Sequence, residues 1–177
     1  MKINLCSGQM LKDGYINMDL LPFTDKQGRT TQVIGNVLEL DKFFQPNSVE
    51  EIIAFHCLEH LYPQDVLVVL KHCYNILTIQ GKLIVECPDF IKAYKYYITD
   101  RKNIKGYAHC IMGGDGIKYG ESWWHKSMWV ANMMEEEMKN IGYRNTRISD
   151  GISHNNSGRD FRVEGIKWSS TKTIQVK

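Results

Sequence analysis

The chain has 177 residues, of which 43% are hydrophobic and 24% charged, with a formal net charge of +2. This size predicts one domain with a single core, and the small net charge argues against a polyanionic partner held by charge alone. No window approaches the roughly 18 apolar residues of a membrane span, and Met1-Lys2 lead directly into a predicted strand. We therefore expect no signal peptide and no membrane association.

The five cysteines are scattered, and no two of them form a Cys-x-x-Cys pair. An odd number at such spacings predicts neither a disulfide framework nor a thiolate zinc site. We therefore expect a reduced, cytoplasmic protein. The cysteines are Cys6, Cys57, Cys73, Cys87 and Cys110.

Short apolar runs alternate with helix-like stretches, which predicts an α/β fold with a mostly parallel sheet. The fourth run is almost continuously apolar, so that strand should be buried on both faces. Only eight residues separate the first two runs, too few for a crossover helix, so the first helix should be shortened or absent. The predicted strands of this part are Lys2–Cys6, Tyr15–Asp19, Thr31–Ile34, Glu51–His56 and Lys82–Cys87.

Two helices are predicted in the remaining chain. One follows Pro63 and should end at Gln80-Gly81, and the other should run from Ser127, as its cap, to about Asn140 before Gly142. The last two strands, Tyr143–Ser149 and Phe161–Trp168, should form a hairpin around the polar segment 150–158. We expect one domain over residues 1–168 and a polar tail over residues 169–177. The long, weakly periodic segment Asp89–Lys126 resembles an active-site cover.

The ends of the first two predicted strands carry the earliest functional signal. Cys6-Ser7-Gly8 forms a small turn after the first strand, and Asp19 ends the second. In open α/β sheets, ligands bind at the carboxyl ends of the strands, where such a turn lets backbone approach closely and an acid accepts ribose hydroxyls. This pair predicts a nucleoside cofactor.

A series of motifs in order strengthens that interpretation. Together they resemble the class I S-adenosylmethionine-dependent methyltransferases, and especially the small branch with a shortened first helix, methyltransferase type 11-like. The resemblance implies a Rossmann-like sheet, mostly parallel with an antiparallel C-terminal hairpin, over residues 2 to about 167. The motifs are Lys2-Ile-Asn-Leu-Cys-Ser-Gly, Tyr15-Ile-Asn-Met-Asp19, Asn36-Val-Leu-Glu-Leu, His56-Cys-Leu-Glu-His60, Ile76-Leu-Thr-Ile-Gln-Gly-Lys-Leu-Ile-Val-Glu-Cys-Pro-Asp89 and His125-Lys-Ser.

The resemblance also implies S-adenosylmethionine as the cofactor and S-adenosylhomocysteine as its product. The chain departs from the family pattern where Cys6 and Gln80 replace glycines and Asn36 replaces an aspartate. We expect Cys6 to fit its turn without a positive φ, and Asn36 to accept from an adenine amine. The cofactor-binding residues implied by the resemblance are Cys6, Ser7, Gly8, Asp19, Leu20, Asn36, Val37, Phe55 and His56.

The segment His56-Cys-Leu-Glu-His60 also matches the inverted zinc-protease signature. That chemistry needs both imidazoles on one helix face, whereas this segment follows a buried strand and precedes Pro63. We therefore expect a strand-to-helix turn and no metal. Two alternatives stay open for Glu59 and His60: they order the turn or face the acceptor, or they are cap and surface residues.

The segment before the second predicted helix contains the strongest acceptor-side candidates. Trp123 and Trp124 either fill the edge of the core or wall a substrate pocket, and the glycine-rich stretch 113–116 resembles a flexible loop more than a phosphate loop. By the resemblance, His125 is the recurrent histidine ahead of the last helix. His125 and His60 are the candidate catalytic residues.

The segment 92–105 interleaves lysines and arginine with tyrosines. That composition is typical of single-strand nucleic-acid platforms, but it is commoner in amphipathic surface helices. We expect the second, so nucleic acid is not the favoured partner.

Methyl transfer from a sulfonium mainly needs alignment of acceptor, methyl and leaving sulfur, and an oxygen acceptor also needs a base. The two histidines favour an oxygen of a sugar or a related small polar metabolite. The alternatives are a non-catalytic cofactor-binding or accessory protein and a nucleic-acid methyltransferase module. Either segment 89–126 covers the acceptor, or a partner subunit does so, as in a homodimer, or the site is open to a large acceptor.

Overall fold

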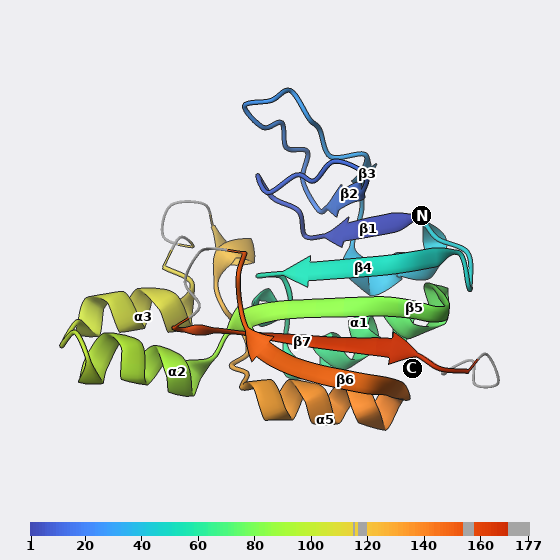
Figure 1. Cartoon of the computed structure of the whole chain (residues 1–177). Helices are drawn as coiled ribbons and strands as arrows, with labels where there is room; N and C mark the ends of the chain where they lie inside the picture. Colours follow the sequence, from blue (N-terminus) through green and yellow to red (C-terminus); the bar gives the residue numbers. More distant parts are fainter. Residues whose placement is uncertain (115, 117–119, 154–157, 170–177) are drawn as a thin grey trace.

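A seven-stranded mixed sheet organises the computed structural model, which describes residues 1–114, 116, 120–153 and 158–169 (Figure 1). The strand order is β3-β2-β1-β4-β5-β7-β6, with β1 to β5 parallel and β7 antiparallel to both neighbours. The mostly parallel sheet with an antiparallel C-terminal hairpin is thus confirmed. The strands are β1 (Lys2–Leu5), β2 (Ile16–Asp19), β3 (Val33–Ile34), β4 (Val49–Phe55), β5 (Leu77–Pro88), β6 (Tyr143–Asp150) and β7 (Asp160–Lys167).

The helices of the described residues differ in length and type. The α-helices are α1 (Pro63–Ile76), α2 (Phe90–Tyr94), α3 (Ile104–Met112) and α5 (Ala131–Ile141). Three 3₁₀-helices, η1 (Val37–Lys42), η2 (Leu58–His60) and η4 (Glu121–Trp123), and one π-helix, η3 (Lys95–Thr99), complete the set. Together α2, η3 and α3 form an arm beyond the carboxyl ends of the parallel strands (Figure 1).

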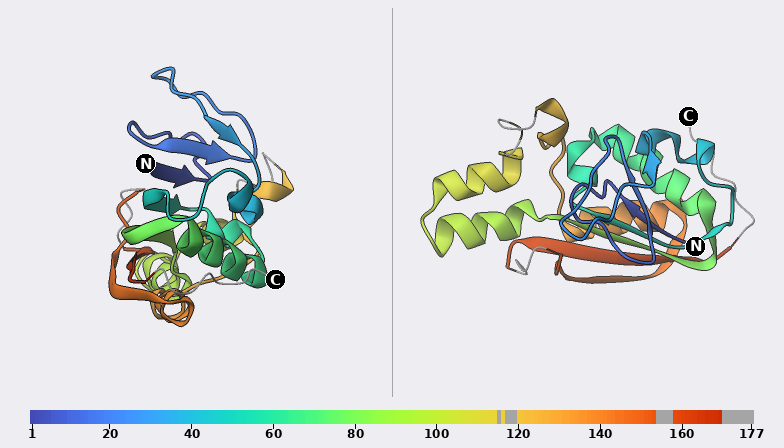
Figure 2. Two further views of the ribbon diagram at one scale, coloured as in Figure 1. Left: turned by 90° about the vertical axis from the view of Figure 1, so that its right-hand side faces the viewer. Right: turned by 90° about the horizontal axis from the view of Figure 1, so that it is seen from above.

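The main core lies on one face of the sheet, where α1 and α5 pack side by side (Figure 2). Leu5 and Met18 from the strands and Leu70 and Met138 from these helices are each at most 1% exposed. On the opposite face, Ile53, Phe55 and Ile84 form a small second cluster, packed by Met10 and Tyr15. β4 is therefore buried on both faces, as its apolar run predicted.

α1 ends four residues earlier than predicted. Its last residue is Ile76, and β5 begins at Leu77, so Gln80-Gly81 lies inside a strand. Gln80 has φ +65° there, which keeps the left-handed conformation that glycine adopts without strain. Gln80-Gly81 was therefore correctly predicted to have an unusual backbone conformation, but it lies within β5 and not at the end of α1.

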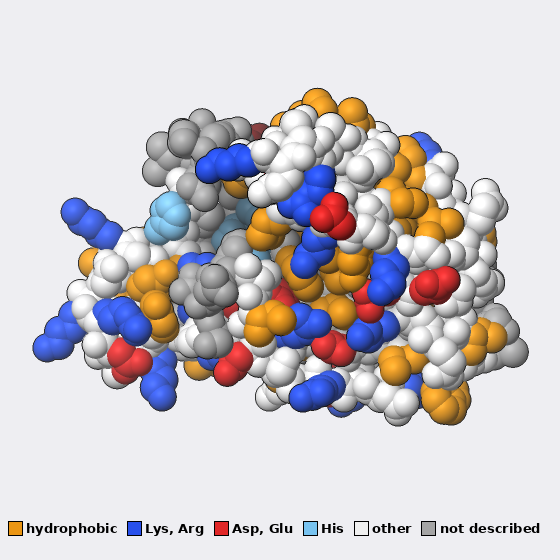
Figure 3. Space-filling model, turned by 45° about the horizontal axis from the view of Figure 1, so that its top comes forward, with side chains coloured by type: hydrophobic (Ala, Val, Ile, Leu, Met, Phe, Trp, Pro, Cys, Tyr) orange, Lys and Arg blue, Asp and Glu red, His pale blue; other side chains and the backbone are white. Residues whose placement is uncertain are grey.

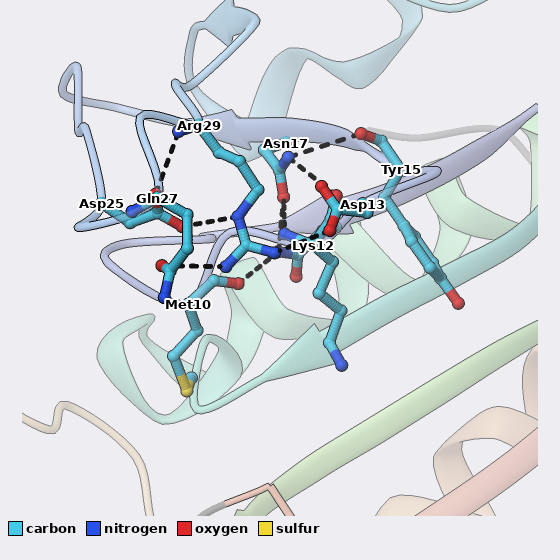
Figure 4. A network of polar contacts seen from close by, with 9 residues as sticks. Met10, Lys12, Asp13, Tyr15, Asn17, Asp25, Gln27 and Arg29 are labelled. Carbon is cyan, nitrogen blue, oxygen red and sulfur yellow. Dashed lines mark hydrogen bonds and ion pairs between the residues drawn. The ribbon is translucent and has the colours of Figure 1, made fainter.

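A polar network replaces the first crossover helix (Figure 4). Asn17 of β2 accepts hydrogen bonds from the Asn4 side chain at 2.9 Å and from the Lys12 backbone at 2.8 Å. Its own amide donates to the Lys12 carbonyl at 3.1 Å. Arg29 reaches from the β2–β3 connection to Asp13 at 3.1 Å. Side-chain amides therefore shape the loop that follows β1.

The segment after β5 is helical rather than aperiodic. Asp89 caps α2 by accepting from the backbone N–H groups of Ile91 and Lys92, each at 3.0 Å. Its other oxygen accepts from Ala131 N at 3.3 Å, at the start of α5. Ser127 is therefore not the cap of that helix, and its hydroxyl instead accepts from the indole of Trp129 at 2.8 Å.

Two expected features lie partly outside the described residues. Of the predicted tail 169–177, the structure describes Ser169 alone, whose carbonyl accepts from Tyr74 at 3.3 Å. Of the hairpin segment 150–158, residues 154–157 are not described. Among the described helices, none is long and apolar enough to cross a membrane.

Candidate functional site

The turn after β1 meets the end of β2. The Ser7 N–H donates to the Met18 carbonyl at 3.0 Å, and the Gly8 N–H donates to Asp19 Oδ2 at 2.8 Å. Cys6 and Gly8 both have φ +48°. The expectation that Cys6 avoids a positive φ is therefore wrong, because the turn keeps a glycine-like conformation at this position. The turn and Asp19, the two features that predicted a cofactor site, are joined by a direct hydrogen bond.

Three further candidates lie along the same edge of the sheet. Leu20 is 57% exposed directly after Asp19. Asn36 is exposed, but its side-chain oxygen already accepts from Leu38 N at 3.0 Å and caps η1. Val37 is 6% exposed and packs into the main core. The side-chain oxygen of Asn36 is therefore already engaged in capping η1.

A disulfide joins Cys6 to Cys57, across a sequence separation of 51 residues. The expectation of five reduced cysteines is wrong, because β1 and β4 are neighbours in the sheet and their carboxyl ends bring the two residues together. The bond ties the turn after β1 to the turn after β4. Cys73, Cys87 and Cys110 are free and buried.

The turn after β4 contains a chain of buried charged groups. His56 Nδ1 lies 3.1 Å from Glu59 Oε1, and His56 Nε2 lies 3.6 Å from Asp160 Oδ2. Burial alone would raise the pKa of Glu59, but the hydrogen bond and charge of His56 outweigh it and lower that pKa to about 2. Burial lowers the pKa of His56, but both carboxylates outweigh it, so the net shift is upward.

Phe55, the residue before this turn, points to the sheet face opposite α1. Its ring lies 5.3 Å from Lys12 Nζ and 5.7 Å from the Arg162 guanidinium, within cation–π distance. Phe55 is 7% exposed. Its side chain therefore packs in the second apolar cluster, whereas His56 turns toward Glu59.

His60 and His125 meet although they are far apart in the chain. Their rings pack edge to face with centroids 4.8 Å apart, and His60 Nδ1 lies 3.4 Å from the Trp124 carbonyl. The backbone N–H groups of Lys126 and Ser127 donate to the Glu59 carbonyl at 2.7 and 3.2 Å. Burial, the largest influence, lowers the pKa of His125 to about 4, so this imidazole is neutral at pH 7.

The tryptophans before His125 are both half-buried. A Cβ on Gly116 would lie 2.7 Å from the Trp124 ring, so this ring packs directly on the Gly116 backbone. Residues 115 and 117–119 of the expected flexible loop lie outside the described residues. In the described part, the His125 N–H donates to the Met112 carbonyl at 3.2 Å, which fastens the segment to the end of α3.

The zinc-protease geometry is not formed by His56 and His60. His56 has φ +50° at the end of β4, and His60 ends the three-residue helix η2. The predicted strand-to-helix turn is confirmed, and the two rings serve different neighbours. His56 orients Glu59, whereas His60 packs against His125.

The tyrosines of the arm pair with one another. Tyr94 and Tyr107 stack edge to face at 5.8 Å, and Tyr96 and Tyr97 do so at 4.9 Å. The Arg101 guanidinium lies 3.5 Å from the Tyr96 ring. These contacts occur within the helical arm, as expected of an amphipathic surface element.

The buried polar residues between the strands were missed in the sequence. Asp160 begins β7 and faces His56, and Glu86 of β5 accepts from Arg162 at 2.9 Å and from Ser153 N at 2.9 Å. For Glu86 the sequence did offer a signal, because a single charged residue interrupts the apolar run of β5.

The fold is that of class I S-adenosylmethionine-dependent methyltransferases. A methyltransferase of Archaeoglobus fulgidus superposes with a TM-score of 0.64 at 12% identity, covering 94% of this chain and 85% of its own. A Thermotoga maritima methyltransferase, described as a possible histamine N-methyltransferase, superposes at 0.59 and 14%, covering 94% and 81%.

A phosphoethanolamine N-methyltransferase of Haemonchus contortus, solved with S-adenosylhomocysteine, superposes at 0.55 with 10% identity. That match covers 95% of this chain and 48% of the Haemonchus chain. The sequence matches no protein-family model and no curated protein. At these identities the likeness establishes the fold.

Proposed function

We propose that this protein transfers a methyl group from S-adenosylmethionine to an oxygen of a small polar acceptor, such as a sugar. The observation that carries the proposal is the Gly8–Asp19 hydrogen bond beside the switch point of a class I sheet. Strand order reverses between β1 and β4, and open α/β sheets bind ligands at that point. The solved relatives named above support the same cofactor.

Asp19 is the proposed ribose anchor. Its carboxylate accepts from Gly8 N at 2.8 Å and from Leu21 N at 3.3 Å, and a carboxylate has about four acceptor positions. Two positions therefore remain for vicinal hydroxyls. Leu20 is exposed beside it to contact the adenine, and the Cys6–Gly8 turn offers close backbone approach.

His60 and His125 are the proposed acceptor-side groups. They lie next to the turn after β4, and the Cys6–Cys57 disulfide joins that turn to the Cys6–Gly8 turn, where we place the cofactor. Because burial lowers the pKa of His125 to about 4, it is a weaker base at neutral pH than the sequence suggested. The arm and the half-buried tryptophans before His125 are the proposed cover of the acceptor.

Calorimetric titration with S-adenosylhomocysteine tests the cofactor assignment. Charge-assisted hydrogen bonds contribute roughly 1.5–3 kcal/mol each, so Asp19→Ala should weaken binding at least about tenfold. Asp13→Ala removes an exposed carboxylate from the neighbouring loop and should leave the affinity unchanged.

Circular dichroism would show that the Asp19 variant is folded, and Asp19→Asn, which keeps one acceptor oxygen, should lose less affinity than alanine. Equal affinity of folded Asp19→Ala and the parent chain would contradict the cofactor placement. Tight binding without methylation of any hydroxyl acceptor would instead favour the accessory-protein alternative.

A further inference from the structure

We propose that Glu59, His60 and His125 form a binding site for a divalent transition-metal ion, for which Zn²⁺ is the best-matched probe. Each residue offers one ligand atom, and these atoms all lie within 4.8 Å of one another. Two imidazoles and one carboxylate are a ligand set of catalytic zinc sites that keep an open position.

The carboxylate of Glu59 has an unused buried oxygen. Glu59 is 2% exposed, and its Oε1 is held by His56 at 3.1 Å. Within the described residues its Oε2 is buried and has no hydrogen-bond partner of ordinary geometry, and the carboxylate also interacts with the Cys87 thiol, which is a weak donor. A buried acceptor left without a partner destabilises the fold by roughly 1–3 kcal/mol, and by more when it is charged. A cation bound at this oxygen would offset that destabilisation.

Both histidines are oriented as metal ligands commonly are. One ring nitrogen of His60 faces the Trp124 carbonyl at 3.4 Å, and the His125 ring lies near the backbone of Ile111. Such backbone contacts fix the ring and leave the second nitrogen to bind an ion.

The site needs only a small closure. Zinc bonds of about 2.0–2.2 Å place tetrahedral ligand atoms about 3.4 Å apart, so shifts on the order of 1 Å close the cluster from 4.8 Å. Glu59 and His60 are consecutive in η2, and both histidine rings are half-buried, which leaves access from solvent. Figure 3 shows histidine side chains between the arm and the sheet.

A cation here would deepen the proposed function, on which this role rests. It would stabilise the negative charge that develops on an acceptor hydroxyl as that hydroxyl loses its proton. His56 holds Glu59 in place but is not a ligand. The inference departs from the expectation of no metal, which considered His56 and His60 as the ligand pair.

The test is Zn²⁺ titration of the full, tag-free, chelator-treated chain without reductant, followed by calorimetry. We expect one equivalent to bind, and His60→Ala, His125→Ala and Glu59→Gln each to weaken binding at least about tenfold. His72→Gln, in the C-terminal half of α1 and outside the ligand cluster, is the matched control and should bind Zn²⁺ as the parent does.

Glu59→Gln conserves side-chain volume and, with circular dichroism, separates ligand loss from unfolding. Absence of stoichiometric Zn²⁺ binding would overturn the inference, as would unchanged affinity in folded His60→Ala and His125→Ala. S-adenosylhomocysteine titration of the same samples keeps the two proposals distinguishable, because cofactor binding does not require these three side chains.

Discussion

Replacement of His125 by asparagine should lower turnover on a hydroxyl acceptor about 100-fold or more. Removing a proton-transfer group costs typically 10²–10⁴-fold in rate, and loss of a metal ligand would act in the same direction. Affinity for S-adenosylhomocysteine should stay within a factor of two or three, because His125 packs on His60, whereas the proposed ribose anchor Asp19 is held by Gly8. Single-turnover kinetics with saturating cofactor measure the effect.

The control for this variant is His72→Gln, which removes a histidine from α1 and should keep full turnover. His125 would be only a packing residue if His125→Asn retained full turnover. A parallel loss of turnover and of cofactor affinity would instead indicate that the variant disturbs the whole site.

Removal of the Cys6–Cys57 disulfide should destabilise the fold by about 2–4 kcal/mol. The bond closes a loop with a sequence separation of 51, for which the chain-entropy model gives about 4 kcal/mol. For a chain of this size the melting temperature should fall by roughly 4–16 °C. The measurement is denaturant unfolding of Cys6→Ser/Cys57→Ser beside the parent chain.

Reductant supplies the matched control. It should destabilise the parent chain and Cys110→Ser, which keeps the bond, but should leave the double variant unchanged. Thiol titration of the denatured parent should detect three free thiols, Cys73, Cys87 and Cys110, and five after reduction. Five thiols without reductant would contradict the bond.

The sheet was predictable because its strands are short apolar runs interrupted by polar turns. β1, β2 and β4 lie within about two residues of their predicted ends. Residues 82–87 of β5 were also predicted as a strand, but its first residues were not, since Leu77-Thr-Ile-Gln80 continues the apolar pattern of α1 and only the sheet pairing decides between helix and strand. A surface helix was expected within residues 92–105, but the extent of the arm was not, because its tyrosines pair with one another around the helices, which obscures a one-sided apolar period.

Local sequence signals name the candidate site residues, but they do not contain how these residues come together. Gly8 and Asp19 follow local signals, and they do hydrogen-bond. The meeting of His60 with His125 depends on the path of the chain through the arm and back to the Glu59 carbonyl, which no local pattern contains. The Cys6–Cys57 bond likewise depends on β1 and β4 being neighbours.

Pairing at Asp89 allows the segment between β5 and α5 to vary in length without disturbing the sheet. The segment leaves the sheet at Asp89 and returns at Trp129, where Asp89 pairs with Trp129 in a parallel bridge and the Phe90 N–H donates to the Trp129 carbonyl at 3.2 Å. Its two ends therefore coincide, and closing a longer excursion between fixed ends costs only about 0.6 kcal/mol per doubling of length. Evolution can therefore lengthen, shorten or rebuild this segment, which we proposed as the cover of the acceptor, while the seven strands stay as they are.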